Sequence, residues 1–241
     1  MIDDIWDIHC HILPGVDDGS QTMEESLETI DTAVSQGIRH FLVTPHFHPG
    51  RYMVYADTVR MTLGKLARAC IESGRDVTFF PGQECYYFSG LKDLLRQGEV
   101  LTLAGSRYVL LEFDPTVPFA YMKQAFRDLQ SAGYRIVLAH FERYKCLSEP
   151  GRLKEVKQEG ILLQLNYDML LEKGGILHRN IWRRYVQDGT VDLLGSDCHG
   201  THFRPIRAGE AFRWLESSVD RQTINRILHR NVNRILNSVQ V

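Results

Sequence analysis

The residues best suited to chemistry lie at the start of the sequence, in the stretch DIHCHILPGVDDGS. His9 and His11 are one residue apart at the end of a short apolar run, and Asp17 and Asp18 follow closely. Residues i and i+2 of an extended segment face the same way, so His9 and His11 can point at one metal ion. The stretch therefore predicts part of a metal site rather than a polar patch of the surface.

Side chains of the same types follow other apolar runs further along the chain. They are His46 in LVTPHFH, Glu84 in FFPGQE, Glu112 in VLLEF, His140 in IVLAH, and Asp197 with His199 in LLGSDCH. Imidazole and carboxylate ligands together suit zinc, manganese or iron. Because the set is too large for one tetrahedral ion, it predicts two or three ions bridged by a carboxylate.

These side chains need strands to position them, and seven short runs rich in Val, Ile, Leu or aromatic residues are predicted as strands. The runs are IWDIH (5–9), IRHFLVT (38–44), DVTFFPG (76–82), YVLLEF (108–113), YRIVLAH (134–140), ILLQLN (161–166) and VDLLGS (191–196). Six of the seven deliver a His, Asp or Glu at or just beyond their carboxyl ends.

Helices are predicted between these strands. In QTMEESLETIDTAVSQG, Thr22 is the predicted N-cap, Glu25 its capping-box partner and Gly37 the C′ glycine. Segments 55–73, 119–132, 151–159 and 176–188 are also predicted to be helical, each with a glycine just past its end, and the last forty residues are predicted to be helical without a further strand.

Strands that alternate with helices predict a parallel α/β architecture. No domain boundary is visible, so we expect residues 1–241 to form one barrel domain. A doubly wound open sheet is the alternative, although the sequence lacks the phosphate loops GxGxxG and GxxxxGK[ST] common in such sheets. In a barrel, the carboxyl ends of the strands converge on the face that holds the active site.

The composition is that of an ordinary globular protein, with 44% hydrophobic and 24% charged residues among 241. A net charge of -2 without a basic block gives no indication of a nucleic-acid partner. We expect a cytoplasmic location and no membrane insertion, because no apolar run would span a bilayer and no secretion signal is evident. The five cysteines, without a CxxC pair, are expected to be reduced. The oligomeric state stays open.

A lone histidine at a strand end is more often packed or hydrogen-bonded than bound to metal, and carboxylates can be helix caps. The coincidence across six strands is what favours a metal site. The histidines without this placement are predicted to be structural, namely His40, His178, His202 and His229. His48 is a candidate for the mouth of the site.

The ordered motifs resemble the PHP superfamily, named for polymerase and histidinol phosphatase. Within it they are most similar to the bacterial protein-tyrosine phosphatases of capsule and exopolysaccharide operons. The likeness covers nearly the whole chain and rests on IHCHILPGVDDGS, VTPHFHPGRY, GQE, LLEF, LAHFERY, QLN and GSDCHGTHFRP. It implies a distorted (β/α)7 barrel.

The resemblance also implies three divalent ions, with manganese the expected metal and iron or zinc the alternatives. The implied ligand sets are His9, His11, Glu84 and Asp197; Glu84, Glu112 and His140, with Glu84 bridging; and Asp18, His46 and His199. Of the adjacent aspartates, Asp17 is the less expected ligand. Arg143 of HFERY and Arg204 of HFRP match the family's arginines that hold the substrate phosphate, a role that suits the forked guanidinium group.

The activity implied by the resemblance is hydrolysis of phosphotyrosine on an autophosphorylated bacterial tyrosine kinase that controls capsule or exopolysaccharide synthesis. Metal ions can lower the pKa of a bound water from about 15.7 toward 7. The tyrosine leaving group, with a pKa of about 10, needs little help from an acid. The alternatives are a histidinol-phosphate phosphatase or other small-molecule phosphomonoesterase, a nuclease-type PHP domain and a non-catalytic metal-binding module.

One further motif points to a different mechanism. Cys146 and Arg152 have the C-x5-R spacing of cysteine-dependent tyrosine phosphatases. In that case Glu149 would place a like charge inside a loop that must hold a phosphate dianion, and no strongly apolar strand leads directly into Cys146. We therefore predict an ordinary surface loop here.

Overall fold

All seven predicted runs contain strands in the computed structural model, which describes residues 4–172 and 180–238. These strands are β1 Ile5–Cys10, β2 Ile38–Val43, β5 Thr78–Pro81, β7 Tyr108–Glu112, β8 Arg135–Leu138, β9 Leu162–Asn166 and β10 Leu193–Gly195. Three strands too short for a periodic signal are added, β3 His46–His48, β4 Tyr52–Met53 and β6 Glu84–Tyr86.

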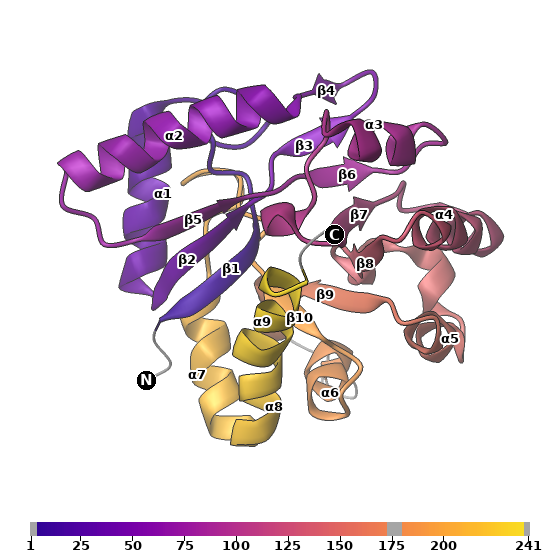
Figure 1. Ribbon diagram of the computed structural model, residues 1–241. Coiled ribbons are helices and arrows are strands. Elements are labelled where there is room, and N and C mark those ends of the chain that lie inside the picture. The colour runs from indigo at the N-terminus through magenta and orange to yellow at the C-terminus, as the bar shows by residue number, and fades with distance from the viewer. Residues whose placement is uncertain (1–3, 173–179, 239–241) are drawn as a thin grey trace.

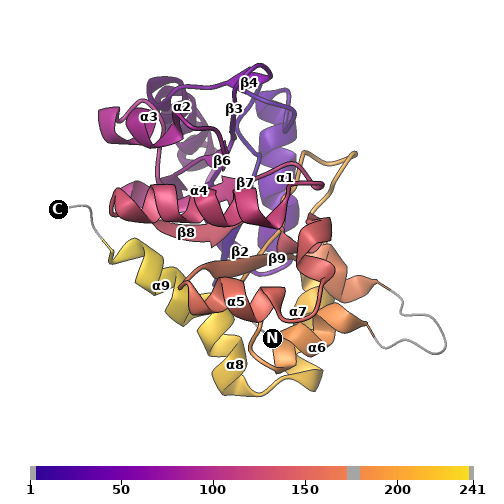
Figure 2. The same ribbon diagram turned by 90° about the vertical axis from the view of Figure 1, so that its right-hand side faces the viewer.

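The predicted helices are present, and they lie outside the sheet (Figures 1 and 2). The α-helices are α1 Met23–Ser35, α2 Ala56–Glu72, α3 Leu91–Gln97, α4 Phe119–Ser131, α5 Arg152–Gln158, α6 Ile181–Gln187, α7 Ala208–Ser218, α8 Arg221–Asn225 and α9 Asn231–Leu236. Single turns are η1 Leu103–Gly105, η2 Phe141–Arg143, η3 Lys145–Ser148, η4 Tyr167–Leu171 and the π-helical η5 Arg226–Arg230. The short α3 was not expected, and residues 176–179 of one predicted helix lie outside the described residues. No helix in the described ranges is long and apolar enough to cross a membrane.

The start of α1 confirms one half of the predicted capping box. The Thr22 side chain accepts a hydrogen bond from the Glu25 backbone N–H at 3.2 Å. The Glu25 carboxylate, however, accepts from the backbone N–H of Gln21, at 2.8 Å, so the reciprocal bond falls one residue earlier than predicted. Gly37 follows the helix with φ of 94°, which confirms the expected C′ glycine.

The strands form a curled sheet in two parts, β1-β2-β5 and β10-β9-β8-β7-β6-β3-β4. The pairings are parallel except for the hairpin of β3 and β4. Pro45 separates β2 from β3, because proline has no N–H to donate to a ladder. Backbone pairing of Cys10 with Cys198, an isolated parallel β-bridge and not a disulfide, then joins β1 to the residues after β10. The prediction of a distorted α/β barrel is confirmed, and the open doubly wound alternative is wrong.

Side chains alternate between the two faces of each strand, which divides the interior into an apolar part and a polar part. On β7, Tyr108 and Leu110 lie in the interior apolar cluster, and Glu112 is next on the same face. Val232 and Ile235 of α9 complete that cluster. The interior is therefore packed at the amino ends of the strands, and polar side chains occupy the carboxyl ends.

The loop after β1 folds back tightly on the end of the strand. The Ser20 N–H donates to the His11 carbonyl oxygen at 3.0 Å, and the Gly15 N–H donates to the Ser20 carbonyl oxygen at 2.9 Å. A Cβ atom on Gly19 would lie 2.0 Å from the His11 carbonyl oxygen and 2.6 Å from the His11 Cβ. Only glycine permits this approach of two backbone segments.

We predict that Gly19→Ala lowers the free energy of unfolding by about 1–3 kcal/mol, the usual cost of forcing extra atoms into a packed site. Urea denaturation of the purified variant measures this change. The control is Gly64→Ala within α2, where an added Cβ meets no atom within 4 Å. That change should leave stability equal or raise it by up to about 1 kcal/mol, because alanine favours helix. Equal stability of Gly19→Ala and the wild type would contradict the prediction.

Candidate metal centre

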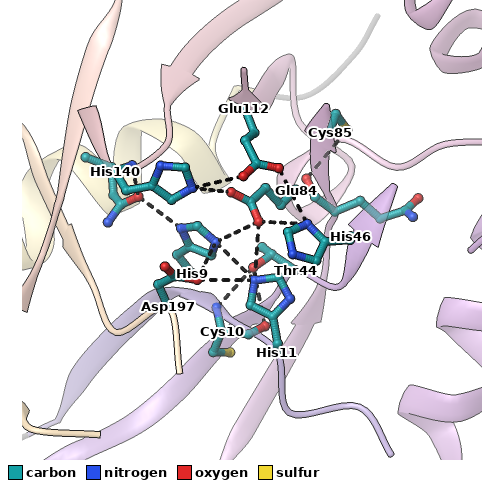
Figure 3. A network of polar contacts seen from close by, with 12 residues as sticks. His9, Cys10, His11, Thr44, His46, Glu84, Cys85, Glu112, His140 and Asp197 are labelled. Atoms are coloured by element: carbon teal, nitrogen blue, oxygen red, sulfur yellow. Dashed lines mark hydrogen bonds and ion pairs between the residues drawn. The ribbon is translucent and has the colours of Figure 1, made fainter. Parts of the chain in front are cut away.

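The predicted ligand residues meet at the carboxyl ends of the strands. Figure 3 shows seven of them directed toward one another, namely His9, His11, His46, Glu84, Glu112, His140 and Asp197. Within the described residues, three groups of side chains could each hold an ion, with ligand atoms no more than 4.8 Å apart. The first group is His9, His11, Glu84 and Asp197; the second is His46, Glu84 and Glu112; and the third is His11, Asp18, His46 and His199.

The first group is fully enclosed and has the same four members as the first set that the resemblance implied. His9 Nε2 lies 3.3 Å from Glu84 Oε2 and 3.6 Å from Asp197 Oδ1. His11 Nε2 lies 3.3 Å and 3.5 Å from the same two oxygens. The two histidines one residue apart thus face a common pair of carboxylate oxygens, as the i, i+2 spacing predicted.

The second group contains the carboxylates of Glu84 and Glu112, with His46 where the resemblance implied His140, and His140 lies beside it. His140 Nε2 lies 2.7 Å from Glu84 Oε1 and 3.6 Å from Glu112 Oε1. His46 Nδ1 approaches the same pair from another side, 3.0 Å from Glu84 Oε2 and 3.6 Å from Glu112 Oε2. Glu84 therefore belongs to both the first and the second group. His46 contacts the second group as well as Asp18, its expected partner in the third.

The third group is the one nearest to solvent. Asp18 Oδ1 lies 3.4 Å from His46 Nε2 and 3.4 Å from His199 Nε2. The Asp18 side chain is 41% exposed, whereas that of His199 is buried. An ion held here would be reached through the Asp18 side of the cluster.

Two of the predicted ligands occupy strained backbone positions. His140 has φ of 29° and Asp197 has φ of 50°, in the left-handed region that residues other than glycine seldom adopt. The Asp197 N–H donates to the His9 carbonyl oxygen at 2.8 Å, which fixes the turn against β1. Such strain often marks functional sites, where it aims a side chain in a direction that a regular strand would not allow.

A chain of buried amides supports the cluster from behind. Gln164 Oε1 accepts a hydrogen bond from the backbone N–H of His140 at 2.8 Å, which identifies this atom as the amide oxygen. Because an amide oxygen can only accept, His9 Nδ1, 3.0 Å away, must donate to it. In the neutral imidazole, His9 Nε2 then has a lone pair that faces the cluster. Gln164 Nε2 donates to Asn166 Oδ1 at 2.8 Å, and Asn166 Nδ2 donates to Asp197 Oδ2 at 3.0 Å. Partners of this kind orient metal ligands in other proteins.

Asp17 has the same supporting role for His11. Its Oδ2 lies 2.8 Å from His11 Nδ1 and accepts the His46 N–H at 2.9 Å, while its Oδ1 accepts the Gly19 N–H at 3.0 Å. With these contacts Asp17 faces away from the three groups. The supporting roles of Asp17, Gln164 and Asn166 were not predicted from the sequence, although the alternation within QLN could have indicated that the last two face the ligands.

Burial and mutual charge shift the pKa values of these groups. Burial lowers the pKa of His46 to about 4, although Glu84 acts in the opposite direction, so its imidazole is neutral and can offer a lone pair. Burial alone would raise the pKa of Glu84, but His9, His46 and His140 hold it well below its usual range. Burial raises the pKa of Glu112 well above its usual range, and the charge of Glu84 adds to this effect.

Several buried atoms of the cluster lie close to other ligand atoms yet make no hydrogen bond, and this observation tests whether metal ions fit. Glu84 Oε2, His46 Nδ1 and His199 Nε2 are buried without a hydrogen-bond partner among the described residues. Buried polar atoms almost always have partners, and those that lack one require an explanation. Imidazole nitrogen and carboxylate oxygen are the ligands that zinc, manganese and iron accept, so this donor set fits such ions.

Arg143 and Arg204 lie together beside this cluster. Arg204 Nη1 donates to Asp197 Oδ2 at 3.0 Å, and Arg143 Nη2 donates to the same oxygen. The other oxygen of Asp197 faces His9 and His11. One carboxylate thus links the ligand cluster to both predicted phosphate-binding residues.

The histidines that were not predicted as ligands lie outside the three groups, as far as the structure describes them. His40 pairs with Asp4 at 2.8 Å and stacks on Trp6, with ring centroids 4.7 Å apart. His48 stacks on Tyr86, with ring centroids 4.1 Å apart. Among the others, His202 and His229 are also outside the groups, and His178 lies outside the described residues.

The C-x5-R segment has the structure of an ordinary loop. Arg152 Nη1 donates to the backbone carbonyl of Cys146 at 2.8 Å, and its Nη2 pairs with Glu149 at 2.6 Å. Burial raises the pKa of the Cys146 thiol, with Arg152 acting in the opposite direction. A thiol with a raised pKa is a poor nucleophile at neutral pH, so the segment does not have the properties of a cysteine phosphatase site.

We predict that Gln164→Leu weakens metal binding by about 10- to 100-fold, the usual cost of losing a partner of a metal ligand. The change removes the acceptor that orients His9 and the His140 backbone. Competition with a fluorescent chelator for Mn²⁺ measures the affinity. Gln130→Leu is the matched control, since it deletes one hydrogen bond, to the Glu159 carbonyl at 2.8 Å, away from the site. Equal affinities of the two variants would contradict the prediction.

Comparison with known proteins agrees with this geometry. The family model for capsular polysaccharide synthesis, CpsB/CapC, matches residues 5–237. The chain is 33% identical to tyrosine-protein phosphatase YwqE of Bacillus subtilis, over 87% of this chain and 83% of that protein. It is 27% identical to tyrosine-protein phosphatase CpsB of Streptococcus agalactiae, over 95% and 97% of the two chains.

A solved structure is similar over nearly the full length. It comes from work on YwqE of Bacillus subtilis and CpsB of Streptococcus pneumoniae, described as unique metal-dependent tyrosine phosphatases. The TM-score is 0.86 at 30% identity, covering 98% of this chain and 96% of the other. From the sequence match and the shared fold, the chain belongs to the CpsB/CapC family of capsular polysaccharide synthesis proteins.

Proposed function

We propose that this chain is a metal-dependent tyrosine phosphatase, a phosphoric monoester hydrolase that acts on phosphotyrosine. The observation that carries the proposal is the sharing of Asp197, whose two oxygens face the buried ligand cluster and the paired arginines. Metal ions held by this cluster and the two guanidinium groups beside it would together attract a phosphate dianion. Family membership supports the same reaction, since the named relatives are tyrosine-protein phosphatases.

The proposed ligands are the nine residues expected from the sequence, and we propose three ions, with manganese the preferred metal. They are His9, His11, Asp18, His46, Glu84, Glu112, His140, Asp197 and His199. Divalent ions bound there would supply positive charge to the phosphoryl oxygens and lower the pKa of a water molecule toward neutrality. The short distances within the three groups and the bridging place of Glu84 support this assignment.

Arg143 and Arg204 are proposed to bind the phosphate. Each guanidinium group can exchange its contact with Asp197 for phosphate oxygens, and Asn166 still donates to the Asp197 oxygen after that exchange. Phosphoryl transfer depends mainly on positioning and on stabilisation of charge, which forked donors supply. Because the tyrosine phenol has a pKa of about 10, its phenolate can leave without a separate proton donor.

We further propose that the substrate is an autophosphorylated tyrosine kinase that regulates capsule or exopolysaccharide synthesis, and that the enzyme acts in the cytoplasm as one domain spanning residues 1–241. Support for the substrate comes from the family's role in capsular polysaccharide synthesis. Support for the single domain comes from the joining of β1 to the residues after β10, which connects distant parts of the sequence.

The deciding experiment measures turnover of a phosphotyrosine peptide by protein stripped with chelator and refilled with Mn²⁺. Histidinol phosphate, the substrate of the alternative enzyme, is tested beside it. We expect peptide hydrolysis that disappears on chelation and returns with Mn²⁺, because the proposed ligands need their ions. Hydrolysis of histidinol phosphate alone would replace the substrate, and peptide hydrolysis that persists after chelation would contradict the metal mechanism.

A pair of variants separates the metal mechanism from a thiol mechanism. His140→Ala should abolish turnover of the peptide, since it removes a proposed ligand that contacts both Glu84 and Glu112. Cys146→Ser should keep turnover within about 2-fold of the wild type, because the thiol has a raised pKa and lies in a separate loop. Steady-state kinetics of both variants provide the check, and inactivity of Cys146→Ser would favour the thiol mechanism.

A further inference from the structure

Phe203 is the most exposed aromatic side chain in the described part of the chain, with 76% of its surface open to solvent. It belongs to the loop between His199, a proposed metal ligand, and Arg204, a proposed phosphate-binding residue. A single exposed aromatic residue is unremarkable by itself. Phe203 differs from other exposed residues in its place between a proposed metal ligand and a proposed phosphate-binding residue.

The loop that carries Phe203 is fixed at its base. The His199 N–H donates to the Arg204 carbonyl oxygen at 3.0 Å, so the two ends of the loop are tied together. Gly200 has φ of 88°, and a Cβ there would lie 2.1 Å from Glu25 Oε1, so α1 packs directly against the loop. Phe203 is therefore held at a defined position relative to His199 and Arg204.

Phe203 contacts the phosphate-binding group directly. The guanidinium carbon of Arg204 lies 5.3 Å from the centroid of the Phe203 ring, a cation–π contact. The same guanidinium group donates to Asp197 Oδ2, at the edge of the ligand cluster. A phosphate bound by Arg204 would thus place its ester group close to the Phe203 ring.

A second aromatic ring lies on the His46 side of the cluster. Tyr52 stacks on His46 with ring centroids 5.6 Å apart and an interplanar angle of 13°. His46 and His199 both contact Asp18, the exposed member of the third group. The solvent side of the cluster therefore has Tyr52 near His46 and Phe203 near His199.

We propose that Phe203 is a specificity-determining residue, whose ring packs against the aromatic ring of the substrate and makes the site prefer aryl over alkyl phosphates. The inference rests on the proposed function, because the phosphate must lie on Arg204 and the ions. Aromatic rings attract one another in offset or edge-to-face contact, an interaction that an alkyl ester cannot make.

Binding of two phosphonates that cannot be hydrolysed tests this inference without reliance on turnover. Calorimetry compares phenylphosphonate with methylphosphonate on the Mn²⁺-loaded protein. In Phe203→Ala, the preference for phenylphosphonate should fall by about 2- to 10-fold while the affinity for methylphosphonate is retained. Phe203→Tyr keeps the ring and should keep the preference. Ile71→Ala, at an equally exposed apolar residue near the far end of α2, should also keep it.

The outcomes distinguish this inference from the proposed function. Wild-type preference in Phe203→Ala, or equal weakening of both phosphonates, would overturn the role of Phe203 and leave the phosphatase intact. If the wild type binds neither phosphonate, the phosphate site of the proposed function fails, and the role of Phe203 fails with it. Equal metal content and circular dichroism spectra of all variants ensure that a loss of preference reports on the ring.

Discussion

The structure depends on one buried carboxylate, that of Glu84. Its two oxygens lie within 3.3 Å of four imidazole rings that come from three separate parts of the barrel. A buried charge is costly unless it is paired or coordinates a metal. The cluster therefore has to be built as a whole, and the supporting hydrogen bonds of Asp17 and Gln164 keep the imidazole rings directed inward.

The barrel accommodates this buried charged cluster by separating its interior into an apolar half and a polar half. Alternation along a strand places apolar residues such as Leu110 at the amino ends and acidic residues such as Glu112 at the carboxyl ends. The apolar half, completed by α9, contributes hydrophobic burial. The polar half contributes chemistry at the cost of strained turns at His140 and Asp197. Stability and function are thus assigned to opposite ends of the same strands.

Much of this arrangement could be predicted from the sequence, because strand runs and their polar ends are local features. The runs containing His9, Glu112 and His140 illustrate this, since each strand was found and each side chain joins the cluster. The division of the second strand at Pro45 was missed, because two- and three-residue strands leave no periodic pattern.

The second contact of His46 was also missed, and so was the supporting role of Gln164. Both depend on distances between residues far apart in the chain, for example from Gln164 to His9, and such distances are set by how the strands close. A pattern within one run can indicate which way a side chain faces, but it does not specify which partner lies opposite.

The barrel is closed by the backbone pairing of Cys10 with Cys198, and this has a consequence for how the protein folds during synthesis. The end of β1 and the turn after β10 carry ligands of the same group, so that group cannot assemble until Asp197 has left the ribosome. Contacts so distant in sequence form late and slowly, because a long loop must be closed before they stabilise anything. Metal ions bound only to the closed barrel would stabilise it by mass action. Metal supply during synthesis would then influence how much of the protein completes its fold.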